Sequence, residues 1–304
     1  MYHLSGGISM LSGILLLALG GALWCLVGIC YEKLPQKEAL HPPYLFAGGL
    51  ITCLFLGLGF MPEKAPVHDV GLVALFLIPA GLLTLPQVIF LKKALTYGSP
   101  GGAWCIMQSA MMCPLLAMIF LYGEKLSIPA WCGIGLLALG IAAWGAGKKE
   151  EEKEEEKKGR NHGKFLLFSL LSFGCTGLQQ ILTLIPSKIS SLGENALSWR
   201  VFLMQLPLLL WGIPCLVKKS PVTGKAWKFG AVLGISIAGG ELLFFCGIDA
   251  MNKIDLSGLA YPAALNFCIL LFALYCRFYL KRPFRKVELG ALALTVSGIT
   301  LLIF

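Results

Sequence analysis

The stretch 147–164, GKKEEEKEEEKKGRNHGK, has a composition unlike the rest of this chain. It holds six of the sixteen acidic and seven of the twenty-five basic residues, and long apolar runs lie on both sides of it. Seven bases and six acids leave a net charge of only +1, and acid-to-base spacings of three and four residues suit a solvated helical turn. We therefore interpret the stretch as a soluble linker between two membrane-embedded parts of the chain.

The composition outside this linker predicts an all-α, polytopic protein of the cell (cytoplasmic) membrane. The chain is 57% hydrophobic and 13% charged, with a mean hydropathy of +0.78, whereas a soluble domain is roughly a quarter charged. The net charge of +9 comes from short basic clusters between apolar runs, such as Lys92-Lys93 and Lys218-Lys219. Such clusters fit loops at lipid headgroups, so the expected partner is the bilayer and not a nucleic acid.

Ten apolar runs approach the roughly 20 residues that a membrane-spanning helix needs. They are 8–30, 44–61, 70–91, 99–122, 127–146, 165–186, 196–217, 226–248, 257–279 and 287–304. Five runs precede the charged linker and five follow it. The expected organisation is a first five-helix repeat over 1–146, a linker over 147–164 and a second five-helix repeat over 165–304.

A comparison of the chain with itself favours this division. At an offset of 156, the stretch 94–125 lies over 250–281, so that Gly102 meets Gly258 and Ala117 meets Ala273. An odd number of spans in each repeat would give the two repeats opposite orientations. Inverted repeats of this kind are typical of secondary transporters.

A family resemblance rests on residues 90–145. FLKKAL (90–95) and MMCPLLAMIFLYGEKLSIPAWCGIGLLALGIAAWG (111–145) resemble the EamA-type transporters of the drug/metabolite transporter superfamily. The residues that carry the likeness are Ala94-Leu95, Pro114, Gly123-Glu124-Lys125-Leu126-Ser127, Gly133 and Gly140. In the second half Ala250 and Gly290 are retained, but Pro262 comes earlier and Lys281 stands where the turn glutamate would be. The resemblance implies ten helices in inverted repeats around a central cavity, and the transport of small metabolites or drugs, often coupled to protons.

Glu241 is the clearest ionisable residue within an apolar run, in ISIAGGELLFFCGI (235–248). A charge at the bilayer centre is costly by at least ~2.5 kcal/mol, so such a residue is a candidate for function. Loss of hydration favours the neutral carboxyl group, which could then take up and release a proton during transport. The alternative is a structural carboxyl group that is hydrogen-bonded to a neighbouring helix.

Other polar or aromatic residues in the apolar runs are candidate contacts for a small-molecule substrate. They are Gln87, Trp104, Gln108, Gln180, Tyr261 and Asn266. Trp104 and Gln108 share one helix face, as Thr176 and Gln180 do. For each of them, packing or hydrogen bonding between helices is the alternative interpretation.

Three further expectations concern local structure. Prolines within four of the runs are expected to kink or break their helices, namely Pro79, Pro86, Pro114, Pro207, Pro214 and Pro262. Gly230 and Gly234 form a small-xxx-small pair, which predicts close packing of two helices. Arg200 and Asp249 lie near the ends of runs, where anchoring or snorkelling at the membrane surface would explain them.

Two observations predict opposite orientations of the chain in the membrane. The loops after the odd-numbered runs, with their flanks, carry twenty of the twenty-five bases, so the positive-inside rule places them in the cytoplasm and both termini outside. Members of the resembled family generally have both termini in the cytoplasm.

The predicted function is a secondary transporter of a small metabolite or drug-like solute, acting by alternating access. The alternatives are a multi-pass membrane enzyme, such as a lipid or isoprenoid transferase, and a non-transporting scaffold. No catalytic residue, cofactor or metal is expected, because the chain has no CxxC pair, only four histidines and no GxxxxGK[ST] loop. The oligomeric state is not predicted.

Overall fold

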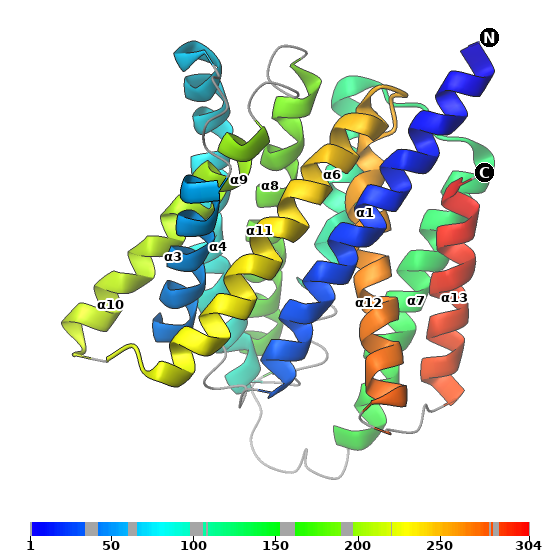
Figure 1. Cartoon of the computed structure of the whole chain (residues 1–304). Coiled ribbons are helices and arrows are strands. Elements are labelled where there is room, and N and C mark those ends of the chain that lie inside the picture. Colours follow the sequence, from blue (N-terminus) through cyan, green and yellow to red (C-terminus); the bar gives the residue numbers. More distant parts are fainter. Residues whose placement is uncertain are drawn as a thin grey trace.

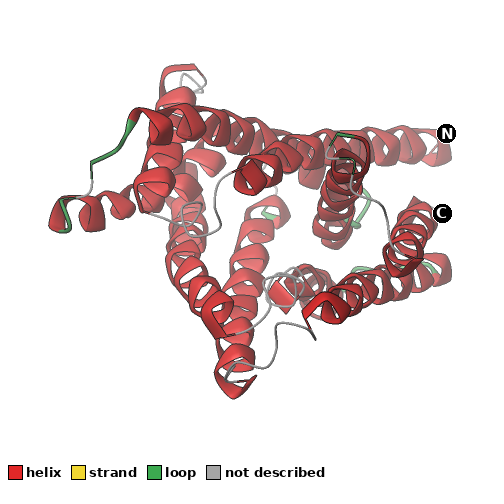
Figure 2. Ribbon diagram, turned by 90° about the horizontal axis from the view of Figure 1, so that it is seen from below, coloured by secondary structure: helices red, strands yellow, loops and turns green. Residues whose placement is uncertain are grey.

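The computed structural model describes residues 2–33, 42–59, 66–97, 106–107, 109–152, 162–189, 197–219, 221–279, 281 and 286–303. All regular secondary structure in these residues is helical (Figure 2). The longer helices are α1 (Tyr2–Lys33), α3 (Pro42–Gly59), α4 (Val67–Tyr97), α6 (Met112–Tyr122), α7 (Ile128–Glu152), α8 (His162–Lys188), α9 (Leu197–Gln205), α11 (Gly224–Asn252), α12 (Ala260–Phe278) and α13 (Lys286–Ile303). The shorter ones are α10 (Gly212–Val217) and the 3₁₀ segments η1 (Ser109–Met111), η2 (Leu206–Trp211) and η3 (Ser257–Leu259).

The helices run roughly side by side and alternate in direction (Figure 1). Five helical segments of the described residues are long and apolar enough to cross a membrane. They are Met10–Val27, Val67–Tyr97, Gly163–Lys188, Trp199–Val217 and Gly224–Asn252. The all-α, membrane-spanning class expected from the sequence is therefore confirmed.

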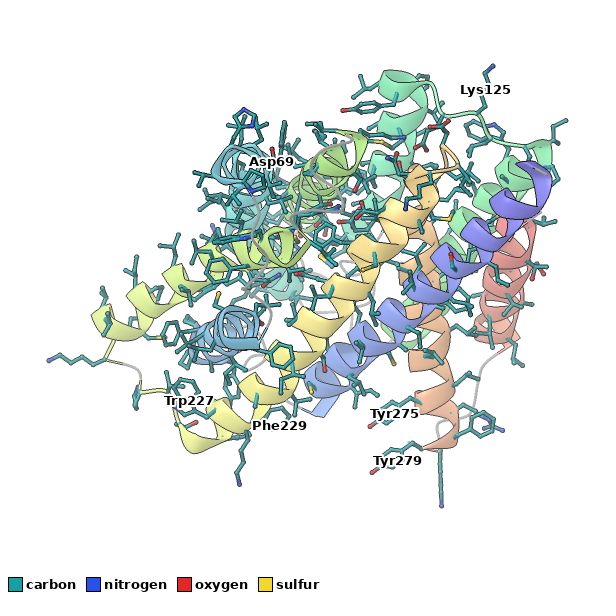
Figure 3. The ribbon with its side chains drawn as sticks, turned by 45° about the horizontal axis from the view of Figure 1, so that its top comes forward. Asp69, Lys125, Trp227, Phe229, Tyr275 and Tyr279 are labelled. Atoms are coloured by element: carbon teal, nitrogen blue, oxygen red, sulfur yellow. The ribbon has the colours of Figure 1, made fainter. Side chains whose placement is uncertain are left out.

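Large apolar side chains cover much of the outer surface. Leu15 and Leu19 on α1 are each 55% exposed, and Leu75 on α4 is 65% exposed. Water would not favour this surface, whereas lipid tails would. Trp227 and Tyr279 lie at the lower end of the molecule and Lys125 at the opposite end, as aromatic and charged residues do near membrane interfaces (Figure 3).

Most of the packing joins helices that precede the linker to helices that follow it. For brevity, α1–α7 are called the N-terminal group and α8–α13 the C-terminal group. α1 packs on α11, α4 on α8, and α7 on α13. The cavity described below is lined mainly by helices of the first two pairs and by α12.

The close packing predicted for Gly230 and Gly234 is confirmed at the contact of α11 with α3. A Cβ atom on Gly230 would lie 2.6 Å from the Cβ of Ala47, and one on Gly234 would lie 2.8 Å from the carbonyl oxygen of Gly48. Thr52 Oγ1 donates across the same contact to the carbonyl oxygen of Gly234, at 3.1 Å. Only glycine lets these two backbones approach so closely.

The seventh expected run is divided into three segments around Pro207, whereas α4 continues as one helix through Pro79 and Pro86. α9 ends at Gln205, the 3₁₀ segment η2 follows, and α10 begins at Gly212. Pro207 has no backbone N–H to donate, which favours the change from α to 3₁₀ geometry at this point. Gln205 therefore lies at the last α-helical position, directly before the break.

Candidate functional site

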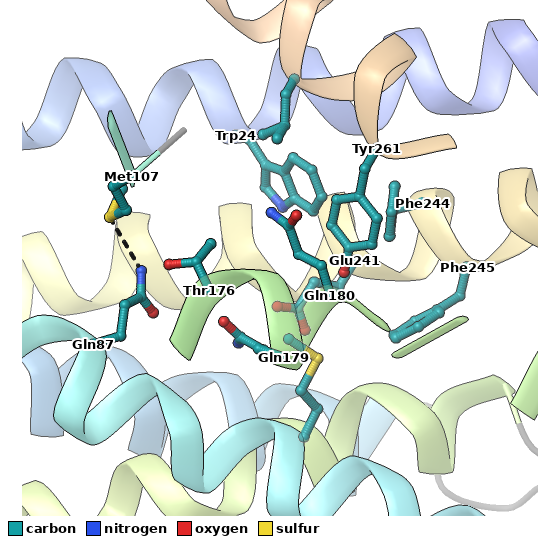
Figure 4. Close-up of a pocket in the computed structure, with 12 residues that line it drawn as sticks. Trp24, Gln87, Met107, Thr176, Gln179, Gln180, Glu241, Phe244, Phe245 and Tyr261 are labelled. Atoms are coloured by element: carbon teal, nitrogen blue, oxygen red, sulfur yellow. Dashed lines mark hydrogen bonds between the residues drawn. The ribbon is translucent and has the colours of Figure 1, made fainter. Parts of the chain in front are cut away.

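A cavity of about 260 Å³ lies among helices of both groups (Figure 4). Its lining comes from α1, α4, α8, α9, α11 and α12 and from the short segment before η1. The lining residues are Trp24, Gln87, Met107, Thr176, Gln179, Gln180, Met204, Glu241, Phe244, Phe245, Tyr261 and Leu265. Four residues proposed from the sequence, which lie between 20 and 174 positions apart in the chain, thus share one cavity: Gln87, Gln180, Glu241 and Tyr261.

Glu241 is the carboxyl group of this cavity and is 6% exposed. Gln205 Nε2 donates a hydrogen bond of 2.6 Å to Glu241 Oε1, from the break between α9 and η2. The second carboxyl oxygen, Oε2, is buried and has no hydrogen-bond partner among the described residues. A buried oxygen in this state is an acceptor for a bound donor or the atom that carries a proton.

Aromatic side chains form one wall of the cavity. The Phe244 ring lies 4.9 Å from the Trp24 ring and 4.6 Å from the Tyr261 ring, measured between centroids. The three rings come from α11, α1 and α12, so the wall depends on the packing of three helices. Such a wall offers flat apolar surface and the electron-rich ring faces that attract cations.

The polar wall opposite is one face of α8. Thr176, Gln180 and Thr183 lie at spacings of four and three residues, which places them on the same side of a helix. Thr183 Oγ1 and the Tyr261 hydroxyl share a hydrogen bond of 2.5 Å, which ties this face to the aromatic wall. Gln180 Oε1 is buried and has no partner among the described residues, so it is a second free acceptor.

Gln87 lies on α4 and lines the edge of the cavity that this helix forms. Its Nε2 atom contacts the Met107 sulfur at 3.4 Å, a weak hydrogen bond (Figure 4). Its backbone oxygen accepts from Ser172 Oγ of α8 at 3.2 Å. Gln179 of α8 donates to Thr84 of α4 at 2.9 Å, so polar contacts link these two helices beside the cavity.

The remaining residues proposed from the sequence lie elsewhere. Asn266 is fully buried but does not line the cavity, and its Nδ2 atom donates to the carbonyl oxygen of Pro262 at 2.6 Å. Trp104 and Gln108 lie outside the described residues. The sequence did not single out Gln205, Gln179 or Trp24. All three are polar or aromatic residues within apolar runs, which was the signal that could have identified them.

The anchoring role expected for Arg200 is wrong. Its side chain is fully buried and its Nη1 atom contacts both carboxylate oxygens of Asp249, at 2.9 and 2.8 Å. Its Nη2 atom donates to Ser187 Oγ at 2.6 Å. The guanidinium lies 4.3 Å from the centre of the Phe245 ring, and the Phe245 side chain lines the cavity. An ion pair inside the protein, and not the membrane surface, therefore accommodates this charge.

No group of three or more His, Cys, Asp or Glu residues in the described part of the chain could hold a metal ion. The titratable chemistry of the cavity therefore rests on Glu241 and the Tyr261 hydroxyl, with Arg200 and Asp249 behind one wall.

Comparison with solved structures shows that this fold occurs elsewhere. One crystal structure, described only as that of a protein, has a TM-score of 0.62 with this chain. The match covers 95% of this chain and 97% of the other chain, at 18% sequence identity. A likeness at this identity concerns the fold alone. No family model and no curated protein matches the sequence.

Proposed function

We propose that the chain is a secondary transporter that moves a small solute across the membrane by alternating access. The observation that carries this proposal is the cavity between the two helix groups, which contains a buried carboxyl group with one free oxygen. Transporters of this type hold their substrate near the membrane midplane, between two halves that rock around it. Glu241 and Gln180 both lie well inside their helices, away from the ends.

The packing of the two groups supports an inverted repeat. α1 packs on α11 and α12, and α8, at the same place in the second group, packs on α4 and α6. The first helix of each group thus packs on the third and fourth helices of the other group. The fifth helices of the two groups, α7 and α13, pack on each other. Reciprocal contacts of this kind are what a two-fold relation between the groups would produce.

A local motif supports the same relation. Ser109 begins the 3₁₀ segment that precedes α6, and Pro114 is the third residue of α6. Ser257 begins the 3₁₀ segment that precedes α12, and Pro262 is the third residue of α12. In both helices proline occupies the first turn, where its missing N–H leaves no intrahelical bond unmade.

Within this function Glu241 is the proton carrier. An ionised carboxylate without a cation beside it is unfavourable in a membrane, and Gln205 provides a neutral donor only. The nearest cation described above, Arg200, is paired with Asp249. Glu241 would therefore exchange its proton for a bound donor during the cycle, which couples solute movement to proton movement.

The cavity also indicates the kind of solute. Its volume of about 260 Å³ lies just below the roughly 300–1,000 Å³ that is usual for small-molecule sites, so the solute is small. Glu241 Oε2 and Gln180 Oε1 would accept hydrogen bonds, and the Phe244 wall would cover an apolar part. A small amphipathic solute that carries an amino group satisfies both walls, through hydrogen bonds and cation–π contact.

A binding screen tests this function before any transport assay. The purified protein is melted in the presence of a panel of amines, amino acids, nucleosides and organic acids. We expect amino-group compounds to raise the melting temperature, and Glu241→Gln and Gln180→Leu to remove that rise. Leu178→Ala is the matched control, because Leu178 is 49% exposed on the same helix as Gln180.

The two alternative functions predict other results in this screen. A scaffold would give no rise in melting temperature with any compound. A lipid or isoprenoid transferase would respond to lipid-like substrates and would convert them on incubation. Either result would contradict the transporter proposal.

A further inference from the structure

Glu124 lies in the turn between α6 and α7, away from the cavity, and is only 4% exposed. Its Oε1 atom accepts hydrogen bonds from the Ser257 backbone N–H at 3.0 Å and from Ser257 Oγ at 2.5 Å. Its Oε2 atom accepts from the Gly258 N–H at 2.9 Å. One carboxylate of the N-terminal group thus binds the segment that begins α12 in the C-terminal group.

An ion pair adds a third element to this contact. Lys188, the last residue of α8, lies 2.7 Å from Glu124 Oε1. The Glu124 side chain is 1% exposed and the Lys188 side chain 10% exposed, so water screens the pair little. Charge-assisted hydrogen bonds of this kind are stronger than neutral ones. Glu124 therefore joins α6–α7, α8 and α12 at one end of the bundle.

Two short routes connect this end to the cavity. Ser257 precedes Tyr261 by four residues, or one helical turn, and Tyr261 lines the cavity. Ser187, the neighbour of Lys188, accepts a hydrogen bond from Arg200, whose guanidinium lies over Phe245 of the cavity wall. A movement of Tyr261 or of Phe245 in the cavity wall would therefore be transmitted to the hydrogen bonds of Glu124 through one or two side chains.

The turn after α12, at the opposite end of the bundle, differs in sequence from the α6–α7 turn. The residues after α12, at 279–285, read YLKRPFR and include no acid. The segment η1, which corresponds to η3 in the proposed repeat, therefore has no carboxylate to receive from the turn after α12. The turn after the fourth helix thus supplies a carboxylate in the N-terminal group, and the corresponding turn of the C-terminal group has none in its sequence.

We infer that Glu124 is a one-sided gate residue, whose carboxylate holds the cavity closed at the end formed by the α6–α7 turn and the start of α12. Access from that end requires Glu124 to leave Ser257, Gly258 and Lys188. This inference rests on the proposed transport function, because a gate has meaning only where the cavity opens to each side in turn. Glu124 does not touch the cavity, so it positions the helices and does not bind the solute.

Distance measurements between spin labels test the gate without any solute. Labels introduced as non-natural amino acids at Ile128 and Asp255 report on the Glu124 end, and labels at Lys92 and Trp227 report on the other end. All four residues are exposed. We expect Glu124→Gln to lengthen the first distance and to raise the open-to-closed ratio by about tenfold or more, as the loss of a charged acceptor would.

A second variant disturbs the same contact without removing a charge. A Cβ atom on Gly258 would lie 2.9 Å from Glu124 Oε2 and 3.0 Å from Met118 Cβ, so Gly258→Ala should displace the carboxylate together with α6 and lengthen the same distance. Lys125→Gln is the matched control, because Lys125 is the exposed neighbour of Glu124 and points away from the bundle (Figure 3). Its distances should equal those of the unmodified protein.

The outcomes separate the gate from the transport function. A longer distance in Glu124→Gln or Gly258→Ala, with Lys125→Gln unchanged, supports the gate even if no solute is yet known. An unchanged distance in both variants overturns it, even if the protein transports. If Glu124→Gln does not fold, Gly258→Ala decides alone, since it keeps Glu124 and Lys188.

Discussion

Gln205 donates its side-chain N–H to Glu241 across 2.6 Å, and this hydrogen bond joins the break after α9 to the middle of α11. Gln205 is 5% exposed, and its side-chain oxygen, Oε1, has no hydrogen-bond partner among the described residues. The carboxyl group is thus held by one neutral donor while its second oxygen stays available to the cavity. The position of Pro207, two residues on, places this donor where the helix changes course.

The Gln205–Glu241 bond should contribute measurably to stability. Gln205→Ala is expected to lower the free energy of unfolding by about 0.6 to 1.7 kcal/mol, the range found for hydrogen bonds between membrane helices. Unfolding in a mixed detergent series measures it. The same substitution in a Glu241→Leu background should have a smaller effect, because leucine has no oxygen to accept the hydrogen bond. Equal effects in both backgrounds would show that the two side chains are not coupled.

The Arg200–Asp249 pair makes a second prediction. Arg200→Met leaves a partly buried carboxylate without its cation, so we expect a loss of about 3–5 kcal/mol in the free energy of unfolding. Arg200→Met with Asp249→Leu should recover most of that loss. Lys228→Met is the control, because Lys228 is an exposed cation on α11 and its loss should leave the melting temperature nearly unchanged. A double variant as unstable as the single one would contradict this account.

A third prediction concerns the contact of α11 with α3. Gly230→Val would place side-chain atoms inside the van der Waals radius of Ala47, so the melting temperature should fall by several degrees. Gly71→Ala is the matched control, since a Cβ atom there meets nothing within 4 Å. A Gly230→Val variant as stable as Gly71→Ala would mean that this contact does not hold the helices together.

Much of the helical architecture could be predicted from the sequence, because a membrane helix leaves a direct hydropathy signal. The run 226–248 lies within α11, and the run 70–91 lies within α4. The break at Pro207 could also be predicted, since proline removes a specific donor. The way helices pair could not be read from hydropathy, because lipid-facing and helix-facing sides are both apolar.

The register of the proposed repeat was harder to predict. An offset of 156 aligns Ala94 with Ala250, but the two 3₁₀ segments, at Ser109 and Ser257, differ by 148 positions. Turns between helices differ in length, so a single offset cannot follow two helices and their connection. The local pattern of serine and, five residues later, proline is the better marker here.

The candidate site was predictable where a polar residue stood alone in an apolar run, as Glu241 and Gln87 do. Partners distant in sequence were not. Glu124 was recognised only as part of a turn, and its partner Ser257 lies 133 positions away. Arg200 was misplaced for the same reason, since its partner Asp249 lies 49 positions away.

Solute accumulation driven by a pH gradient tests the central claim most directly. Proteoliposomes that carry the protein are given a pH gradient, and uptake is followed for the amino-group compound with the largest thermal shift. We predict accumulation that follows the gradient in the unmodified protein. Glu241→Gln should abolish this accumulation, because the variant has no carboxyl group to carry the proton or to accept from the solute. Gradient-driven accumulation that persists in Glu241→Gln would contradict the account.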